Sequence, residues 1–264
     1  VVILSNGGAV TFPWAENVPA IFEGYLLGEA GGAAIVDLIF GAQSPCGKLA
    51  ETFPLAKEDA LVDKYFPGSR DRVEHREGLD VGYRYFDSVK KPVRFPFGHG
   101  LTYTTFKYSD LQVTVTEDRE SSKIVDLQFQ LKNTGDVTAK EIVQCYVHQE
   151  TSLVYRPEQE LSGFAKVELE AGQASTVKMA LTTRDFSTYD IGRSGWIVEA
   201  GNFEIRIASS SRDIRLSKVI SFATGSQPTD ESRVWFSQGS CNVLLAFLTQ
   251  QHAGAWRRKR VSQE

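Results

Sequence analysis

The sequence contains few of the residues that build covalent or metal-bound frameworks. Its 264 residues include three cysteines, Cys46, Cys145 and Cys241, at long and unrelated spacings. An odd number at such spacings predicts neither a disulfide framework nor a zinc site, so we expect buried or free thiols. We therefore predict no metal-binding residues and no cofactor-binding residues.

Neither an excess of positive charge nor a long apolar run is present. The chain has 29 basic and 33 acidic residues, a net charge of −4, which offers no field for nucleic acid. The nearest approach to a long apolar run, Val243 to Leu248, is far shorter than the roughly 20 residues that span a bilayer. We predict no nucleic-acid partner and no membrane span.

The first part of the chain has the pattern of an α/β domain. The apolar run from Val1 to Leu4, followed by Ser-Asn-Gly-Gly, is typical of a buried parallel strand, and such strands need neighbours. Because the chain also lacks an initiating methionine, we expect those neighbours upstream of residue 1. A glycine-rich turn, Gly28 to Gly32, precedes a predicted helix over 33–40 that Gly41 ends. Without the spacing of a phosphate-binding loop, the turn indicates close packing rather than anion binding.

The second part changes to the period of two that half-buried strands show. Val143, Cys145 and Val147 alternate with Gln144, Tyr146 and His148. Similar alternation in the ranges 111–115, 125–131, 177–181, 203–207 and 215–222 predicts about seven strands in an immunoglobulin-like sandwich. Only Cys145 lies within it, so its core must depend on apolar burial.

A polar, charge-rich surface loop is predicted from Lys57 to Arg76, and it contains Pro67-Gly68-Ser69. The candidates for a catalytic pair are Asp59, Asp63, Asp71, Glu74, Glu77 and Asp80. The arginines among them, Arg70, Arg72, Arg76 and Arg84, favour ordinary ion pairing instead.

The histidines and the junction aromatics have structural interpretations that we favour over functional ones. His99 and His148 have no cysteine, serine or second histidine at the spacing of a triad or metal site. The aromatic set could stack on sugar, but hydrophobic packing at a domain junction is the favoured interpretation. Its members are Tyr83, Tyr85, Phe86, Phe95, Phe97, Tyr103 and Phe106.

Two motifs at this junction, GLDVGYRYFD (78–87) and FPFGHGLTYTTF (95–106), resemble a passage of family 3 glycoside hydrolases. There the chain leaves the second catalytic domain and enters a fibronectin type III-like module. The resemblance extends upstream through VVILSNGG, FPW, GYLLGEAGGAAIVDLIFG and SPCGKLAETFP, and downstream through SGFAKVELEAGQ and GWIVEAGNFEIRI. It covers roughly residues 1 to 222.

The resemblance implies the end of an α/β sandwich domain over 1–75, a connection over 76–104 and an all-β fibronectin type III-like sandwich over 105–222. Residues 223–264 stay unassigned, as a disordered extension or an out-of-frame translation. A docking tail for acidic partners is the alternative, because Arg257 to Arg260 are all basic.

One position departs from the family pattern. The usual turn Gly-Gln-Glu-Gly-Gly is similar to Gly28-Glu29-Ala30-Gly31-Gly32 here, so Ala30 replaces a carboxylate. If that carboxylate supports the active site, this chain has lost the support. If it is solvated or caps the helix, little changes.

The resemblance implies a retaining, exo-acting β-glycosidase, with β-glucosidase as the first expectation and β-xylosidase or arabinofuranosidase as in-family alternatives. The family's nucleophile lies on a (β/α)₈ barrel of about 250 residues, and its acid/base glutamate precedes the strand matched by Val1 to Ser5. We therefore assign no catalytic residue to this chain and predict that it is inactive alone.

The resemblance also implies which partners the chain has. The expected partners are the absent barrel and, through the parent enzyme, an oligosaccharide or β-glucoside. Enzymes of this family that carry the fibronectin type III-like module are often secreted or periplasmic. The alternative from another class is a non-catalytic module that binds carbohydrate or protein.

Overall fold

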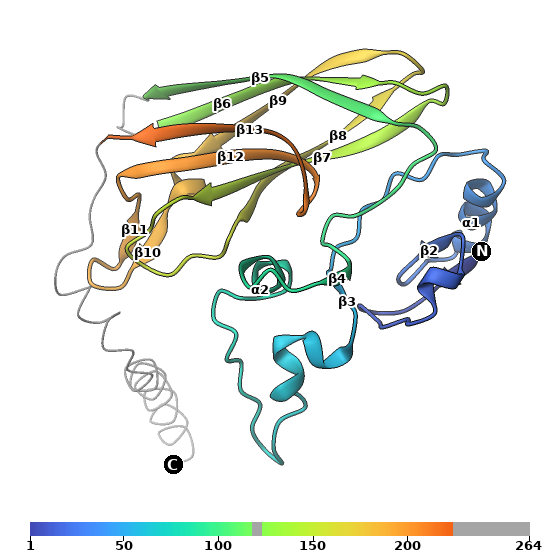
Figure 1. Cartoon of the computed structure of the whole chain (residues 1–264), viewed down its shortest axis with the longest axis horizontal. Helices are drawn as coiled ribbons and strands as arrows, with labels where there is room; N and C mark the ends of the chain where they lie inside the picture. The colour runs from blue at the N-terminus through green and yellow to red at the C-terminus, as the bar shows by residue number, and fades with distance from the viewer. Residues whose placement is uncertain (118–122, 224–264) are drawn as a thin grey trace, which may run out of the picture.

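The computed structural model describes residues 1–117 and 123–223. Figure 1 shows a β-sandwich formed by the later residues and a smaller region formed by the first, joined by a connection that runs beneath the sandwich. The predictions for the tail, for the run 243–248 and for Cys241 lie outside the described residues.

The smaller region begins with two parallel strands. Strands β1 (Val2–Leu4) and β2 (Ile21–Glu23) pair in parallel, as the apolar run predicts, but this neighbour lies downstream in the chain and not upstream of residue 1. The run was expected to be buried, but 42% of Ile3 is exposed. In the described part of the chain β1 has β2 as its one hydrogen-bonded neighbour, so part of the sheet stays uncovered.

Helix α1 (Gly31–Ile39) begins two residues earlier than the predicted helix over 33–40. A side chain at Gly31 would place its Cβ 2.6 Å from the Cβ of Leu27, so the turn needs glycine for close packing. Gly41, with φ of +76°, ends the helix as predicted.

A small apolar core holds this region together. It contains Phe12, Ala15 and Phe53, with Leu4, Val10, Ile21, Leu49 and Phe95 packed against it. The remaining elements are η1 (Ala15–Asn17), η2 (Lys57–Asp59), η3 (Leu61–Lys64) and the antiparallel pair of β3 (Phe53–Pro54) with β4 (Val93–Phe95). A core of this size gives the region little stability of its own.

The sandwich has the seven strands that the alternation predicts, in two antiparallel sheets. One sheet has the order β5-β6-β9 and the other β13-β12-β7-β8. The strands are β5 (Phe106–Glu117), β6 (Lys123–Asn133), β7 (Ala139–Gln149), β8 (Glu160–Leu169), β9 (Ala174–Thr182), β12 (Gly201–Ser210) and β13 (Asp213–Phe222). The turn η4 (Thr183–Phe186) and a short hairpin of β10 (Thr188–Asp190) and β11 (Gly195–Ile197) lie between β9 and β12.

The core between the two sheets is apolar and continuous. Its fully buried members include Leu127, Phe129, Phe186, Phe203 and Ile205. Cys145 is a free thiol in this core, and burial raises its pKa to about 12. The expectation of a buried thiol and an apolar core is confirmed for this residue.

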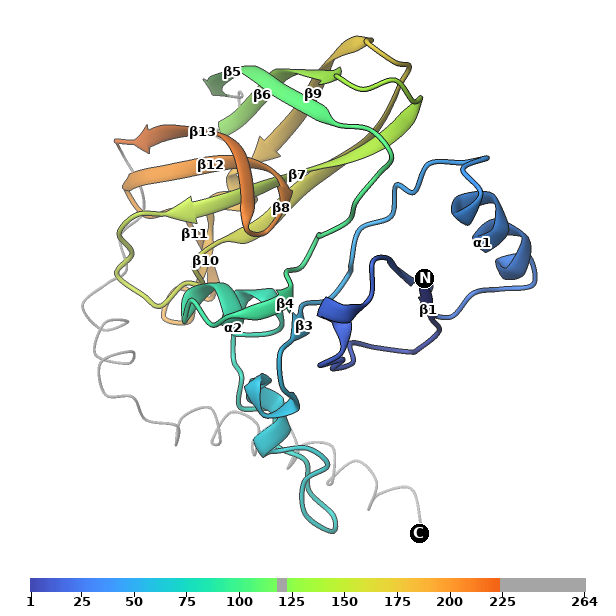
Figure 2. The same ribbon diagram turned by 45° about the vertical axis from the view of Figure 1, so that its right-hand side comes forward.

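The prediction that β7 is half-buried is wrong. Tyr146 and Gln144, on the face expected to meet solvent, are 0% and 3% exposed. The reason is helix α2 (Tyr83–Ser88) and the chain that follows it, which cover this face of the four-stranded sheet (Figure 2). Local alternation cannot reveal a covering segment that comes from another part of the sequence.

Candidate functional site

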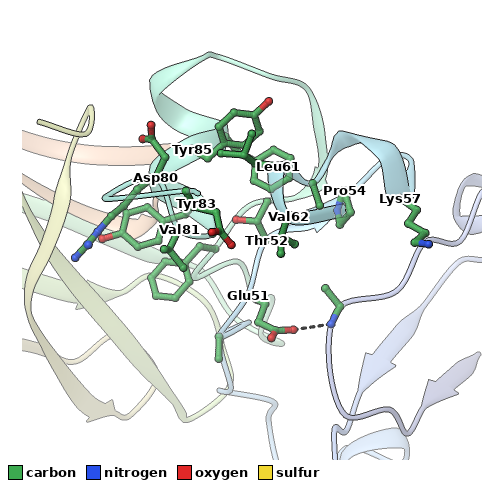
Figure 3. Close-up of a pocket in the computed structure, with 18 of the residues that line it drawn as sticks. Glu51, Thr52, Pro54, Lys57, Leu61, Val62, Asp80, Val81, Tyr83 and Tyr85 are labelled. Carbon is green, nitrogen blue, oxygen red and sulfur yellow. Dashed lines mark hydrogen bonds between the residues drawn. The ribbon is translucent and has the colours of Figure 1, made fainter. Parts of the chain in front are cut away.

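A groove of about 970 Å³ lies beside the connection, where several separate segments meet. Its walls come from residues 9–11, from 50–62 and from 77–86, with Phe97. Figure 3 shows Tyr83, Tyr85, Leu61 and Val62 among the side chains that line it. Its volume is within the range of ligand pockets, so it is the first candidate for a functional site.

The polar side chains of the groove are largely engaged. Glu51 Oε2 accepts a hydrogen bond of 2.5 Å from the Ala9 amide (Figure 3). Asp80 Oδ1 accepts one of 2.5 Å from the Tyr155 hydroxyl. Two carboxyls committed to local contacts do not form the free nucleophile and acid that a retaining glycosidase needs. The groove is therefore a poor candidate for glycoside cleavage.

Three of the six loop acids, Asp59, Asp63 and Glu74, form ion pairs, and Glu74 alone pairs with the arginines that the prediction named. Asp59 lies 2.9 Å from Lys91, and the hydrogen bond from Lys91 holds the pKa of Asp59 below its usual range. Asp63 pairs with Lys57 at 3.1 Å. Glu74 pairs with two of the expected arginines, Arg72 and Arg76, whereas Arg84 pairs with Glu160 of the sandwich instead. Among the described residues, Asp71 and Glu77 have no such partner.

The junction aromatics pack against protein. Tyr83 stacks on Phe97 with ring centroids 4.6 Å apart and meets Tyr146 edge-on at 5.9 Å. The Tyr83 hydroxyl accepts a hydrogen bond of 2.7 Å from the Leu161 amide, and burial raises its pKa. The favoured packing role is therefore confirmed for these rings.

The remaining members differ, because Phe95 packs against the small apolar core, whereas Tyr85 lines the groove and 46% of Tyr103 is exposed. Phe86 is buried, and Phe106 packs against the sandwich core. Tyr103 donates a hydrogen bond of 2.7 Å to the carbonyl of Leu38, which ties helix α1 to the start of the sandwich.

Both histidines occupy structural positions. His99 stacks on Phe95 with centroids 5.1 Å apart, and burial lowers its pKa. His148 Nδ1 lies 2.5 Å from the carbonyl oxygen of Glu158. Neither ring forms part of a triad or a metal cluster in the described residues.

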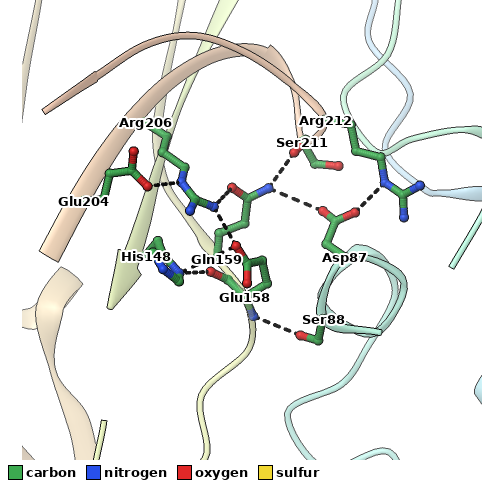
Figure 4. Close-up of polar contacts among 9 residues, drawn as sticks. All are labelled: Asp87, Ser88, His148, Glu158, Gln159, Glu204, Arg206, Ser211 and Arg212. Carbon is green, nitrogen blue, oxygen red and sulfur yellow. Dashed lines mark hydrogen bonds and ion pairs between the residues drawn. The ribbon is translucent and has the colours of Figure 1, made fainter. Parts of the chain in front are cut away.

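A polar network attaches α2 to the sandwich (Figure 4). Arg212 Nε donates a hydrogen bond of 2.7 Å to buried Asp87, and its Nη2 donates to the carbonyls of Phe86 and Lys91. Gln159 Nε2 donates to Asp87 at 3.4 Å and to the Ser211 carbonyl at 2.6 Å. The bonds to Asp87, Phe86 and Lys91 join residues more than 70 positions apart, so the connection is held by the sandwich.

A buried ion pair links the α/β region to the same sheet. Lys48 Nζ lies 3.0 Å from Glu141 Oε1 on β7, with about a tenth or less of either side chain exposed. The Tyr108 hydroxyl donates to the same oxygen at 3.0 Å, and burial, followed by the charge of Glu141, raises the pKa of Tyr108. The α/β region and the sandwich are thus joined by a pair of opposite charges as well as by apolar contacts.

Ala30, at the position where the family usually has glutamate, lies at the N-cap of α1 without a side-chain cap. Both Ala30 and Glu29 are exposed.

Sequence reasoning missed the side chains that join the regions. Arg212, Gln159 and Glu141 lie in no motif, whereas Asp87 and Lys48 lie in motifs that indicated the family but not these contacts. All five pair across long separations in the chain.

Two absences concern residues 1–117 and 123–223. They hold no group of three or more His, Cys, Asp or Glu side chains that could bind a metal ion. None of their helices is long and apolar enough to cross a membrane.

Two family models match the chain. The model of the glycosyl hydrolase family 3 C-terminal domain matches residues 1–103, and that of a fibronectin type III-like domain matches residues 141–211.

Curated relatives extend these matches over most of the chain. Thermostable β-glucosidase B of Acetivibrio thermocellus is 46% identical over 83% of this chain and 29% of its own length. An exo-α-(1→6)-L-arabinopyranosidase of Bifidobacterium breve is 40% identical over 90% of this chain and 31% of its own length. The chain thus spans less than a third of the length of these relatives.

Solved structures agree with the sequence matches. A family 3 β-glucosidase of Bifidobacterium adolescentis superposes with a TM-score of 0.81 at 40% identity, over 87% of this chain and 34% of that one. β-Glucosidase 3B of Thermotoga neapolitana, in complex with glucose, gives 0.77 at 32% identity, over 85% and 31%. The chain therefore belongs to glycoside hydrolase family 3 and corresponds to the C-terminal α/β region and the fibronectin type III-like domain of its members.

Proposed function

We propose that this chain is the non-catalytic C-terminal part of a retaining, exo-acting β-glycosidase that hydrolyses terminal β-linked glucosides. The observation that carries the proposal is the 46% identity to a β-glucosidase over 83% of the chain. The fold similarity to several β-glucosidases of known structure supports it.

The share of the relatives that this chain spans supports the non-catalytic role, because the chain matches only 29% of the β-glucosidase B sequence. A retaining mechanism needs two carboxyls about 5–5.5 Å apart, one to attack the anomeric carbon and one to protonate the leaving oxygen. Glu51 and Asp80 are committed to the Ala9 amide and the Tyr155 hydroxyl. We assign both catalytic groups to the part of the relatives that this chain does not span.

We propose three structural parts with separate roles. Residues 1–75 complete an α/β domain, residues 76–104 connect, and residues 105–222 form the bracing sandwich. The ion pair of Lys48 with Glu141 and that of Arg212 with Asp87 support a bracing role, because they hold the regions in one arrangement.

A second candidate activity is removal of terminal α-L-arabinopyranose. The observation in its favour is the 40% identity to an exo-α-(1→6)-L-arabinopyranosidase over 90% of the chain. The β-xylosidase and arabinofuranosidase alternatives have no such relative among those described above.

The test is the intact mass of the native protein together with its hydrolysis of two substrates. We expect a mass near three times the 29.3 kDa of this chain and hydrolysis of p-nitrophenyl β-D-glucopyranoside. Faster hydrolysis of the α-L-arabinopyranoside would select the second candidate. A native protein of about 29 kDa that cleaves neither substrate would instead support a carbohydrate- or protein-binding module.

A further inference from the structure

A pair of aromatic side chains lies on the outer face of the hairpin of β10 and β11, which projects from one end of the sandwich (Figure 1). Tyr189 and Trp196 are opposite each other across the two strands, with ring centroids 5.3 Å apart. Cross-strand aromatic pairs stabilise hairpins, which explains why the rings are close together. The two residues nevertheless remain 45% and 51% exposed, so the pair still presents aromatic surface to a ligand.

The hairpin holds the two rings outward. The next residue on each strand, Asp190 after Tyr189 and Ile197 after Trp196, is buried, so the opposite face of the hairpin is fixed against the protein. The carboxylate of Asp190 also accepts a hydrogen bond of 3.2 Å from the Arg193 amide in the turn. Because the rings are already held in place, little side-chain freedom is lost when a ligand binds to them.

Arg184 adds hydrogen-bond donors to the pair. Its guanidinium lies over the Trp196 ring and reaches it from the turn η4, where buried Phe186 anchors the backbone in the sandwich core. Within residues 1–117 and 123–223, neither this guanidinium nor the hydroxyl of Tyr189 forms a hydrogen bond or an ion pair. The surface therefore combines two aromatic rings with N–H and O–H groups that have no protein acceptor there.

The size of this surface favours a small ligand over a protein. An aromatic side chain buries roughly 150–250 Å², so two half-exposed rings offer roughly 200 Å² of apolar surface. A specific protein interface needs about 800 Å² on each partner. A pyranose ring is similar in size to one aromatic ring, and its C–H bonds are attracted to the negative face of the π-system. Its hydroxyl oxygens accept hydrogen bonds from a guanidinium, so the surface fits a sugar chain.

We propose that Tyr189, Trp196 and Arg184 form a surface that binds a β-linked glucan chain. In β-linked glucose the ring substituents are equatorial, so both faces of the sugar present C–H bonds to an aromatic ring. The choice of a glucan rests on the proposed function, because that function gives the enzyme a β-linked glucoside as its substrate. Binding of a long chain here raises the effective concentration of that chain for the enzyme that carries the sandwich.

The experiment measures binding of laminarihexaose, a β-linked hexaglucan, to this chain by isothermal titration calorimetry. Trp196→Ala and Tyr189→Ala each remove a stacking contact and should weaken binding about five-fold or more. Arg184→Gln removes the guanidinium donors and should weaken it about three-fold. Phe164→Ala removes a 71% exposed ring on β8, so it is the matched control and should bind as the parent chain does.

A second variant separates binding from folding of the hairpin. Trp196→Phe keeps the cross-strand aromatic pair and should bind with an affinity between those of the parent chain and Trp196→Ala. Urea unfolding of each variant shows whether the sandwich still folds. A variant that keeps the parent midpoint and loses the sugar supports the proposed surface.

The other outcomes overturn the surface without deciding the proposed function. No binding of laminarihexaose, or binding that Trp196→Ala and Tyr189→Ala leave unchanged, would overturn it. Self-association of this chain that Trp196→Ala abolishes would assign the rings to a second copy and also overturn it. The proposed function is tested separately, because a chimaera of this chain with the rest of β-glucosidase B, carrying Trp196→Ala, should still hydrolyse p-nitrophenyl β-D-glucopyranoside at the rate of the parent chimaera.

Discussion

The imidazole of His99 is stacked on Phe95 and withdrawn from water, so burial lowers its pKa from the ordinary value of about 6.5. The nearby Lys48 charge acts in the same direction. In the folded protein the neutral ring is favoured, whereas the unfolded chain takes up a proton below about pH 6.5. The contribution of His99 to the free energy of unfolding is fully present above about pH 6.5 and is lost as the pH falls through the folded-state pKa.

We predict that the urea midpoint falls between pH 7.5 and pH 5.5 and that His99→Phe, which keeps the stacked ring, reduces this fall. The exposed His75→Phe should leave the pH dependence unchanged and serves as the control. An equal fall in the parent chain and the His99 variant would show that the fall has another source.

Arg212 donates to Asp87 and to two backbone carbonyls, so its removal leaves a buried carboxylate without its cation. We predict that Arg212→Ala lowers the free energy of unfolding by about 2 kcal/mol. Arg215→Ala removes an exposed pair with Asp213 on the same hairpin and should cost less than about 1 kcal/mol. Denaturant unfolding of both variants measures the difference, and equal losses would contradict a structural role specific to Arg212.

At the scale of elements, α2 behaves as part of the sandwich, although the family model of the α/β domain includes it. Its Tyr83 covers Tyr146, and the Phe97 carbonyl accepts a hydrogen bond of 2.9 Å from the Ser211 amide. Removing the connection would expose one whole face of β7.

We predict that residues 76–222 form a more stable unit than residues 105–222, by at least about 3 kcal/mol, because two or three large side chains lose their burial. Urea unfolding of the two fragments checks this. Fragments of equal stability would mean that the covering segment adds nothing to the sandwich.

The features that the sequence predicted depend on residues close together in the chain, whereas the features that it missed depend on residues far apart in the chain. The seven strands follow from alternation within each strand, such as Val125 to Leu131, so local pattern was enough. The buried outer face of β7 depends on Tyr83 and Phe97, which lie 63 and 49 positions before Tyr146. Similarly, the motifs of the α/β region indicated the family, but the groove exists only where three distant segments meet.

On the scale of the whole molecule, the two regions differ in their capacity to fold alone. The core of the first region has three buried residues, Phe12, Ala15 and Phe53, whereas the sandwich encloses a continuous core. We predict that residues 1–104 alone unfold without cooperativity. Thermal unfolding followed by circular dichroism measures this, and a sharp transition would contradict the prediction.

The central claim is that this chain completes a β-glycosidase without supplying its catalytic carboxylates. The most direct test compares this chain alone with a chimaera in which it replaces its counterpart in Acetivibrio thermocellus β-glucosidase B, using p-nitrophenyl β-D-glucopyranoside. We predict that the chimaera hydrolyses this substrate and still does so after Glu51→Gln and Asp80→Asn. We predict that the chain alone does not hydrolyse it. Hydrolysis by the chain alone, abolished by those same substitutions, would contradict the central claim.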